Sequence, residues 1–318
     1  MSADISVIIT SHNERPFIPE ALDSVLEQTR SDRISRIIAV DDRSSDGSRA
    51  WWEAQSTRAP NLDLAFVEAF GPAAARNAGL ARVETEYVAF LDGDDFWARD
   101  KLEHQVATLA ASNADIVYGD FVDFTDAPHA GVRICVRQFH VRTRDLARKY
   151  FLWDGPVLPS TVLMRTAVAR STGGFAPELK LFEETDFFWR AAHSGARFQH
   201  CRASLSYKRR RQGSLSHDFG KWIAAADLLA ERSVAIAPGL AADVGRRRGF
   251  RLAKVAEAHF RGGDPAQGWR TLRAALRLNP YNPRAYLYAL SALAPETARE
   301  TLKRRARSLR ALLAGSGE

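Results

Sequence analysis

Cysteine, methionine and long apolar runs are scarce in this sequence of 318 residues. Its two cysteines, Cys135 and Cys201, lie far apart and match no metal-ligand spacing, so we expect reduced thiols in the core. No stretch approaches the roughly 18 apolar residues that a membrane span needs. The opening segment MSADISVII carries no basic leader, so we expect no signal peptide and a cytoplasmic protein.

The positive charge gathers in three short basic runs. The net charge is +7, and the runs KRRR, RRR and KRRAR occupy residues 208–211, 246–248 and 303–307. Such runs suit nucleic acid, diphosphates or an anionic membrane surface, and each also suits a solvated helix face. Because runs spread this widely do not form a nucleic-acid motif, we expect no nucleic-acid partner.

Strand and helix patterns alternate along the first part of the chain. Apolar runs predict strands at residues 5–10, 36–40, 62–68, 87–91 and 115–124. Helical spacing follows most of these runs, and repeated strand–helix units favour an α/β fold whose mostly parallel sheet has helices on both faces. The pattern loosens over 125–180, which indicates loops, and 180–195 is typical of a loop that enters a helix.

The strand patterns vanish from about residue 219. Segments rich in Ala, Leu and Arg predict helices at 221–236, 243–261, 266–278, 284–293 and 296–313. One stretch within them resembles a tetratricopeptide helix hairpin, although a plain helical cap accounts for a single such unit. We therefore expect a catalytic or binding domain at 1–218 and a helical region at 219–318.

Polar side chains follow the ends of three predicted strands. These are Thr10, His12 and Asn13 after the first, Asp41 and Asp42 after the second, and Asp92, Asp94 and Asp95 after another. Ligands of open parallel sheets bind beyond the carboxyl ends of the strands, so one shared crevice is predicted. Turn formation explains either of the first two clusters alone, whereas together they favour a nucleotide site.

The third cluster, in YVAFLDGDDFW, packs three aspartates directly after an apolar run. Carboxylates at this density are costly unless a cation neutralises them. A hard cation such as Mn²⁺ or Mg²⁺ prefers oxygen ligands and shares its coordination with substrate phosphates. A turn that caps a helix accounts for one or two of these aspartates, but a metal site accounts better for all three.

Four segments together resemble a family 2 glycosyltransferase with the GT-A fold. They are ISVIITSHNERPFIPEALDSVLEQT, IIAVDDRSSDGS, AARNAGLARVETEYVAFLDGDDFW and FEETDFFWRA, in the family's order within residues 4–217. The resemblance implies a nucleotide-diphosphate sugar donor, which we expect to be a UDP-sugar, and inverting, Mn²⁺- or Mg²⁺-dependent transfer to a hydroxyl. A glycan or lipid-linked acceptor in cell-surface polysaccharide or glycoconjugate synthesis is implied as well.

The resemblance also implies roles for individual residues. Donor contacts would come from Thr10, His12, Asn13, Asp41, Asp42, Arg76, Asn77, Asp92, Arg209, Arg211 and His217. Within that set, Asp42 would read the uracil edge, and His12 stands where the family usually has a base-stacking tyrosine. The metal would bind Asp94 directly, with Asp92 as a second ligand. Residues 207–218 resemble the family's basic loop that closes over the diphosphate.

The catalytic base is expected near the start of the helix after residue 180. Inverting transfer needs a carboxylate that takes the proton of the acceptor hydroxyl. The family usually has aspartate at the position of Glu184, and Asp186 is the alternative base. Acids are favoured at any helix start by the helix dipole, which explains their charge but not their coincidence with the other motifs.

Two other functions are weighed against the transferase. A sugar nucleotidyltransferase would need a glycine-rich basic loop after the first strand, and SHNERPF contains no glycine. An inactive glycosyltransferase-like module that binds partners through its helices would fit the glutamate at 184.

The basic, amphipathic helix expected at 296–313 would either lie on an anionic membrane or pack on the preceding helices. The oligomeric state is not indicated.

Overall fold

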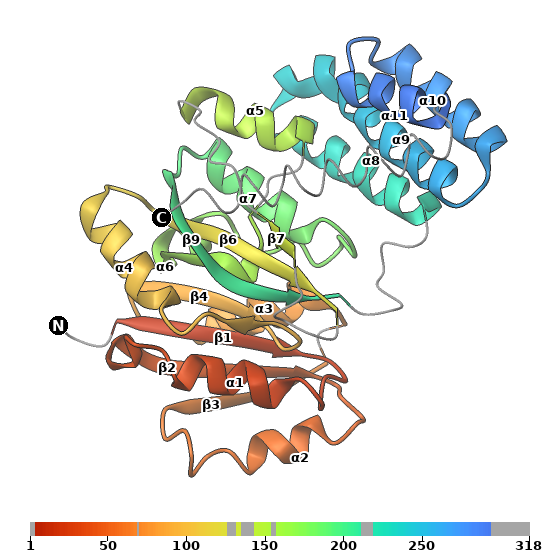
Figure 1. Cartoon of the computed structure of the whole chain (residues 1–318). Coiled ribbons are helices and arrows are strands. Elements are labelled where there is room, and N and C mark those ends of the chain that lie inside the picture. The colour runs from red at the N-terminus through yellow and green to blue at the C-terminus, as the bar shows by residue number, and fades with distance from the viewer. Residues whose placement is uncertain are drawn as a thin grey trace. The chain divides into compact units, whose positions relative to one another are not determined.

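The computed structural model describes residues 4–68, 70–125, 132–134, 143–153, 157–210 and 219–293. The chain forms two compact units. The first comprises Met1–Tyr150 and Gly155–Ser214, and the second comprises Phe151–Asp154 and Leu215–Glu318. Figure 1 shows a sheet flanked by helices in the first unit and helices in the second.

The described part of the first unit contains a single mixed sheet. Its strands are β1 (Ile5–Ser11), β2 (Ile34–Asp42), β3 (Leu62–Val67), β4 (Tyr87–Asp92), β5 (Phe96–Trp97), β6 (Ile116–Phe124), β7 (Val132–Ile134), β8 (Val162–Arg165) and β9 (Phe198–Arg209). They lie in the order β3-β2-β1-β4-β8-β6-β9-β5, with β7 beside β6. The sheet is parallel from β3 to β4, whereas β8 runs antiparallel to both β4 and β6.

Three strands, β7, β8 and β9, lie wholly or partly where the sequence pattern predicts loops. β8 falls within the stretch 125–180, yet it sits in the middle of the sheet between β4 and β6. Its four residues are too few to show a period. β9 extends to Arg209, so the first residues of the predicted basic loop at 207–218 belong to a strand. The helices that the sequence pattern predicts between the first strands of this unit are present.

The helices of the first unit follow the expected strand–helix alternation up to residue 111, whereas two later ones lie in the stretch 125–180, where loops are predicted. The helices of this unit are α1 (Ile18–Leu26), α2 (Ser48–Glu53), α3 (Pro72–Ala81), α4 (Lys101–Ala111), α6 (Thr166–Ser171) and α7 (Glu183–His193). A further helix, α5 (Thr143–Trp153), begins in this unit and ends in the second.

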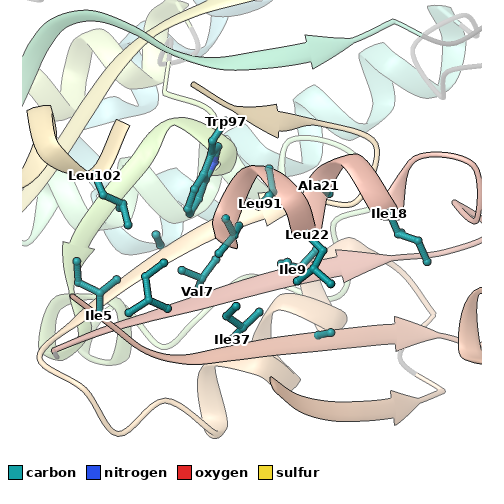
Figure 2. Packing of buried hydrophobic residues seen from close by; sticks show 14 of the residues in the cluster. Ile5, Val7, Ile9, Ile18, Ala21, Leu22, Ile37, Leu91, Trp97 and Leu102 are labelled. Atoms are coloured by element: carbon teal, nitrogen blue, oxygen red, sulfur yellow. The ribbon is translucent and has the colours of Figure 1, made fainter. Parts of the chain in front are cut away.

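The core is built around β1, whose seven residues are all buried, as a strand covered on both faces requires. Figure 2 shows side chains of α1, including Leu22, meeting Ile9 of β1 and Leu91 of β4 in one cluster. On β1, Ile8 packs against Gly79 of α3, where an added Cβ would lie 2.5 Å from the Ile8 Cγ2 atom. This close approach fixes α3, and with it Arg76, against the sheet.

The second unit is helical over its described residues, as predicted. Its helices are α8 (Phe219–Ile236), α9 (Val244–Arg261), α10 (Pro265–Leu278) and α11 (Pro283–Leu293). Ala253, Ala256 and Leu272 belong to a small core of their own. The helix predicted at 296–313 lies outside the described residues. Cys201 of the first unit is a buried free thiol, as predicted, and Cys135 is not among the described residues.

Within the described ranges, no helix is both long and apolar enough to cross a bilayer.

Candidate donor site

The polar strand ends that the sequence singles out are neighbours in the sheet. β2, β1 and β4 are adjacent and parallel, so their carboxyl ends lie at one edge. In the register of these strands, Ser11 pairs with Asp41, and Thr10 pairs with Asp92. The fold therefore brings the three predicted clusters together.

The loop after β1 is tied to the loop after β2. His12 is exposed, and its Nδ1 is hydrogen-bonded to the carbonyl of Asp42. Asn13 adopts a left-handed backbone (φ 53°), donates its N–H to Ser44 Oγ at 2.9 Å, and accepts the Ser45 N–H at 2.8 Å. In this arrangement Asn13 positions the loop, and the ring of His12 is oriented by the neighbouring strand end.

Both aspartates that end β2 are buried and accept backbone N–H groups. Asp41 Oδ1 accepts the Ser44 N–H at 3.0 Å. Asp42 accepts the Phe70 N–H at 3.2 Å and the Gly71 N–H at 2.8 Å, which ties β2 to the segment before α3. These hydrogen bonds hold the loop after β2 and the segment before α3 in place at the end of β2.

The acidic turn after β4 is tightly built. Gly93 donates its N–H to the Thr10 carbonyl at 2.8 Å. A Cβ added at Gly93 would lie 2.6 Å from a Glu14 carboxylate oxygen, so only glycine lets the turn pass this close. Asp92 and Asp94, on either side of Gly93, both keep partial exposure.

Asp95 faces the interior and anchors this turn. It accepts the Ser160 hydroxyl at 2.8 Å and the Arg209 N–H at 3.0 Å. Ser160 Oγ also accepts the Asp92 N–H at 3.2 Å, so one serine fixes both ends of the turn. Burial raises the pKa of Asp95 well above its ordinary value, and the charges of Asp94 and Asp92 raise it further.

Arg76 joins the acidic turn to the helix that carries the predicted base. Its guanidinium donates to Asp92 at 2.6 Å and to Glu183 at 3.0 Å, and the arginine is only 4% exposed. Burial by itself would lower the pKa of Arg76, but the charges of Asp92 and Glu183 raise it above its ordinary value. The guanidinium therefore stays charged and holds two acids from segments far apart in the sequence.

The first turn of α7 separates its acids by environment. Phe182, which precedes the helix, adopts a left-handed backbone with φ 67°. Glu184 is partly exposed, and burial together with the neighbouring Glu183 raises its pKa to about 8. Asp186 is fully buried and accepts from Arg190 at 2.7 Å, so it faces the interior of the unit.

The remaining predicted residues divide into three groups. Asn77 is bonded to both the N–H and the carbonyl of Phe175, so it clamps the segment before α7. Arg209 donates to the Asp94 carbonyl at 3.1 Å and to Glu20 at 2.6 Å, beside the acidic turn. Arg211 and His217 lie outside the described residues.

The residues of the acidic turn fit a hard divalent cation. Asp92 and Asp94 present carboxylate oxygens, the ligands that such a cation prefers, and their charges add to the burial that raises the pKa of Asp95. Among the described residues, no group of three or more His, Cys, Asp or Glu side chains is arranged to hold a metal. A cation here would therefore take its other ligands from phosphates or water.

Sequence reasoning missed Ser160, Glu14 and the partnership of Arg76 with Glu183. Ser160 precedes the short strand β8 in a stretch without periodicity, so no local pattern marks it. Arg76 and Glu183 are 107 residues apart, and only the packing of α3 and α7 reveals their contact.

The mixed sheet flanked by helices, with acidic residues at its strand ends, defines an α/β protein of the GT-A type. The model of the family described as glycosyl transferase family 2 matches residues 6–170 of the chain. This chain belongs to that family.

Individual relatives and solved structures agree with this family. An *Escherichia coli* UDP-Glc:alpha-D-GlcNAc-diphosphoundecaprenol beta-1,3-glucosyltransferase is 33% identical over 118 residues, which is 37% of this chain and 45% of that protein. *Staphylococcus aureus* TarS in complex with UDP-GlcNAc superposes with a TM-score of 0.60 at 20% identity, over 95% of this chain and 92% of that one. The first curated relatives are matched over less than half of their length.

A mannosyltransferase from *Pyrobaculum calidifontis*, solved with GDP-Man and Mn²⁺, gives the same TM-score of 0.60 at 20% identity. It covers 98% of this chain, and 87% of that chain is covered. At these identities the two solved structures establish the shared fold.

Replacing Arg76 with methionine should destabilise the first unit strongly. Asp92 and Glu183 would lose their shared counter-charge, and leaving such acids unpaired in a buried site costs about 3 kcal/mol. Urea unfolding followed by circular dichroism measures this loss. The matched control is Arg82→Met, whose half-exposed side chain bonds Asp63 and should contribute below about 1 kcal/mol. Equal losses in both variants would contradict the central role of Arg76.

Proposed function

We propose that this chain transfers a sugar, with inversion, from a nucleotide-diphosphate donor to an acceptor hydroxyl in a reaction that requires a divalent metal. The observation that carries the proposal is the Arg76 bridge, which joins the acidic turn of β4 to the base-bearing turn of α7. In this reaction the acids of the turn would hold the metal that binds the donor's diphosphate, and an acid of α7 would take the proton of the acceptor hydroxyl. The two sets of acids must therefore lie close together. Family membership and the GT-A fold support the same reaction class.

The proposed donor is a UDP-sugar. Its nucleoside would lie at the ends of β1 and β2, near Thr10, Asp41 and Asp42, and its diphosphate would lie at the end of β4. Two solved structures with the same fold carry UDP-GlcNAc and GDP-Man, so the fold accommodates either base. The basic residue Arg209, beside Asp94, would face the departing diphosphate.

The proposed metal site consists of Asp94, with Asp92 as its second residue. When bound, Mn²⁺ or Mg²⁺ would neutralise charge that develops on the leaving diphosphate. Arg76 holds Asp92 in a fixed orientation, and Ser160 Oγ accepts the Asp92 N–H and so fixes the backbone of the turn. These contacts preorganise the carboxylates, so little reorganisation is needed when the donor binds.

Glu184 is the proposed catalytic base. It is partly exposed at the start of α7, whereas Asp186 is fully buried against Arg190 and has a positioning role in this proposal. A base works best when its pKa lies near the working pH, and burial together with Glu183 raises the pKa of Glu184 to about 8. The extra methylene of glutamate extends its reach from the helix toward an acceptor.

We expect Glu184→Gln to lower kcat by at least about a hundredfold while donor binding is retained, because general-base catalysis contributes that much. For the wild type, kcat/KM should rise with pH up to about 8 and then level, because only the deprotonated carboxylate accepts a proton. Transfer or donor hydrolysis measured between pH 6 and 9 tests both results.

The matched variant is Glu183→Gln, which removes the nearest like charge. The pKa of Glu184 should then fall, and the acidic limb of the pH profile should move to lower pH. A profile that is flat between pH 6 and 9, or full activity in Glu184→Gln, would exclude Glu184 as the base.

The proposed acceptor is a glycan or a lipid-linked sugar. The protein would act on it in the cytoplasm, at the inner face of the cell membrane and in peripheral contact with that membrane. The *E. coli* relative is named for a diphosphoundecaprenol acceptor. Residues 219–318 contain 18 Lys and Arg against 8 Asp and Glu, whereas residues 1–218 contain 27 against 30. α11 also exposes Leu287, Leu290 and Leu293. A basic region that also exposes leucines suits an anionic membrane surface.

The full chain should float with vesicles of phosphatidylglycerol but not of phosphatidylcholine, and binding should weaken as salt rises. Changing Leu287 and Leu290 to serine should reduce flotation, while changing the buried Leu272 to methionine should leave it intact. Equal flotation with both lipids, or none with either, would remove the membrane from this account.

A further inference from the structure

An exposed aromatic ring lies beside the nucleoside end of the proposed donor site. Phe70 follows β3 and is 57% exposed, more than any other large hydrophobic side chain in the described part of the first unit. It precedes α3, so it lies beyond the carboxyl ends of β2 and β3. An apolar ring left in water at this edge of the sheet points to a ligand surface.

A buried acid and a cation hold this ring in place. Asp42 accepts the N–H groups of both Phe70 and Gly71, and its Oδ1 also accepts the Arg43 Nε–H at 3.0 Å. The guanidinium carbon of Arg43 lies 3.8 Å from the centroid of the Phe70 ring, within the range of a cation–π contact. Asp42 therefore fixes both members of the pair.

The backbone of the pair is strained. Arg43 and Phe70 each have a φ of 58°, a left-handed conformation that residues with a Cβ rarely adopt. Strain of this kind persists where surrounding contacts impose it, and it gathers at ligand sites. The Phe70 carbonyl also accepts from Lys180 Nζ at 2.9 Å, which ties the ring's segment to the chain that leads into α7.

We infer that Arg43 and Phe70 form the nucleobase-recognition element of the donor site, an inference that rests on the proposed function. Phe70 stacks on the base, and Arg43 donates hydrogen bonds to a carbonyl oxygen or ring nitrogen at the base edge. Asp42 acts as a positioning residue, because its oxygens already accept from Phe70, Gly71 and Arg43. This moves base stacking from His12, where the sequence places it, to Phe70.

Isothermal titration with UDP, GDP, CDP and inorganic pyrophosphate, each with Mn²⁺, tests the inference on the full chain. Phe70→Ala should weaken every nucleotide that the wild type binds by about tenfold or more, because loss of base stacking costs that much. The affinity of the Phe70→Ala variant for pyrophosphate should stay within about twofold of the wild-type value, since pyrophosphate has no base. Phe70→Trp should restore nucleotide affinity, and Arg43→Ala should change the preference among the three bases.

Arg49→Ala provides the matched control. Its guanidinium carbon lies 4.3 Å from the centroid of Phe66, a similar pair whose ring packs against the core cluster, and its loss should leave nucleotide affinity unchanged. Wild-type nucleotide affinity in Phe70→Ala, or an equal loss for pyrophosphate, would overturn the inference. A wild type that binds none of the three nucleotides would instead overturn the proposed function, and this inference with it.

Discussion

One buried guanidinium holds the site together. Arg76 pairs with Asp92 at the end of β4 and with Glu183 at the start of α7, so it links the two acidic segments of the site. Its own position depends on the packing of Gly79 against Ile8, which seats α3 directly on β1. The central strand β1, the acidic turn after β4 and the start of α7 are therefore joined through a single side chain.

Two acids next to those that Arg76 pairs have raised pKa values. Arg76 compensates Asp92 and Glu183, but the pKa values of Asp95 and Glu184 remain raised. For Asp95 this follows from burial and from Asp94 and Asp92. For Glu184 it follows from burial and from Glu183. In the proposed reaction, a divalent cation at the acidic turn would neutralise Asp92 and Asp94, and Glu184 would act as a base suited to neutral or mildly alkaline pH.

The parts of the fold that repeat were predictable from sequence, and the parts set by long-range contacts were not. Strands β1, β2 and β4 are continuous apolar runs that end in polar residues, so both their type and their shared edge could be read directly. β8 has only four residues, and its place between β4 and β6 depends on pairing across the chain. The roles of Asn77 and Asp186 depend in the same way on partners that sequence spacing does not indicate.

The most direct measurement is a thermal-shift screen of nucleotide sugars with and without Mn²⁺, run on the wild type and on Asp94→Asn. A ligand that binds only the folded protein raises its melting temperature once its concentration exceeds the dissociation constant. We expect at least one UDP- or GDP-sugar to stabilise the wild type in the presence of Mn²⁺, and the shift to disappear in Asp94→Asn, which should itself remain folded. If no nucleotide sugar shifts the wild type, or if Asp94→Asn responds equally, the account of a metal-dependent donor site is contradicted.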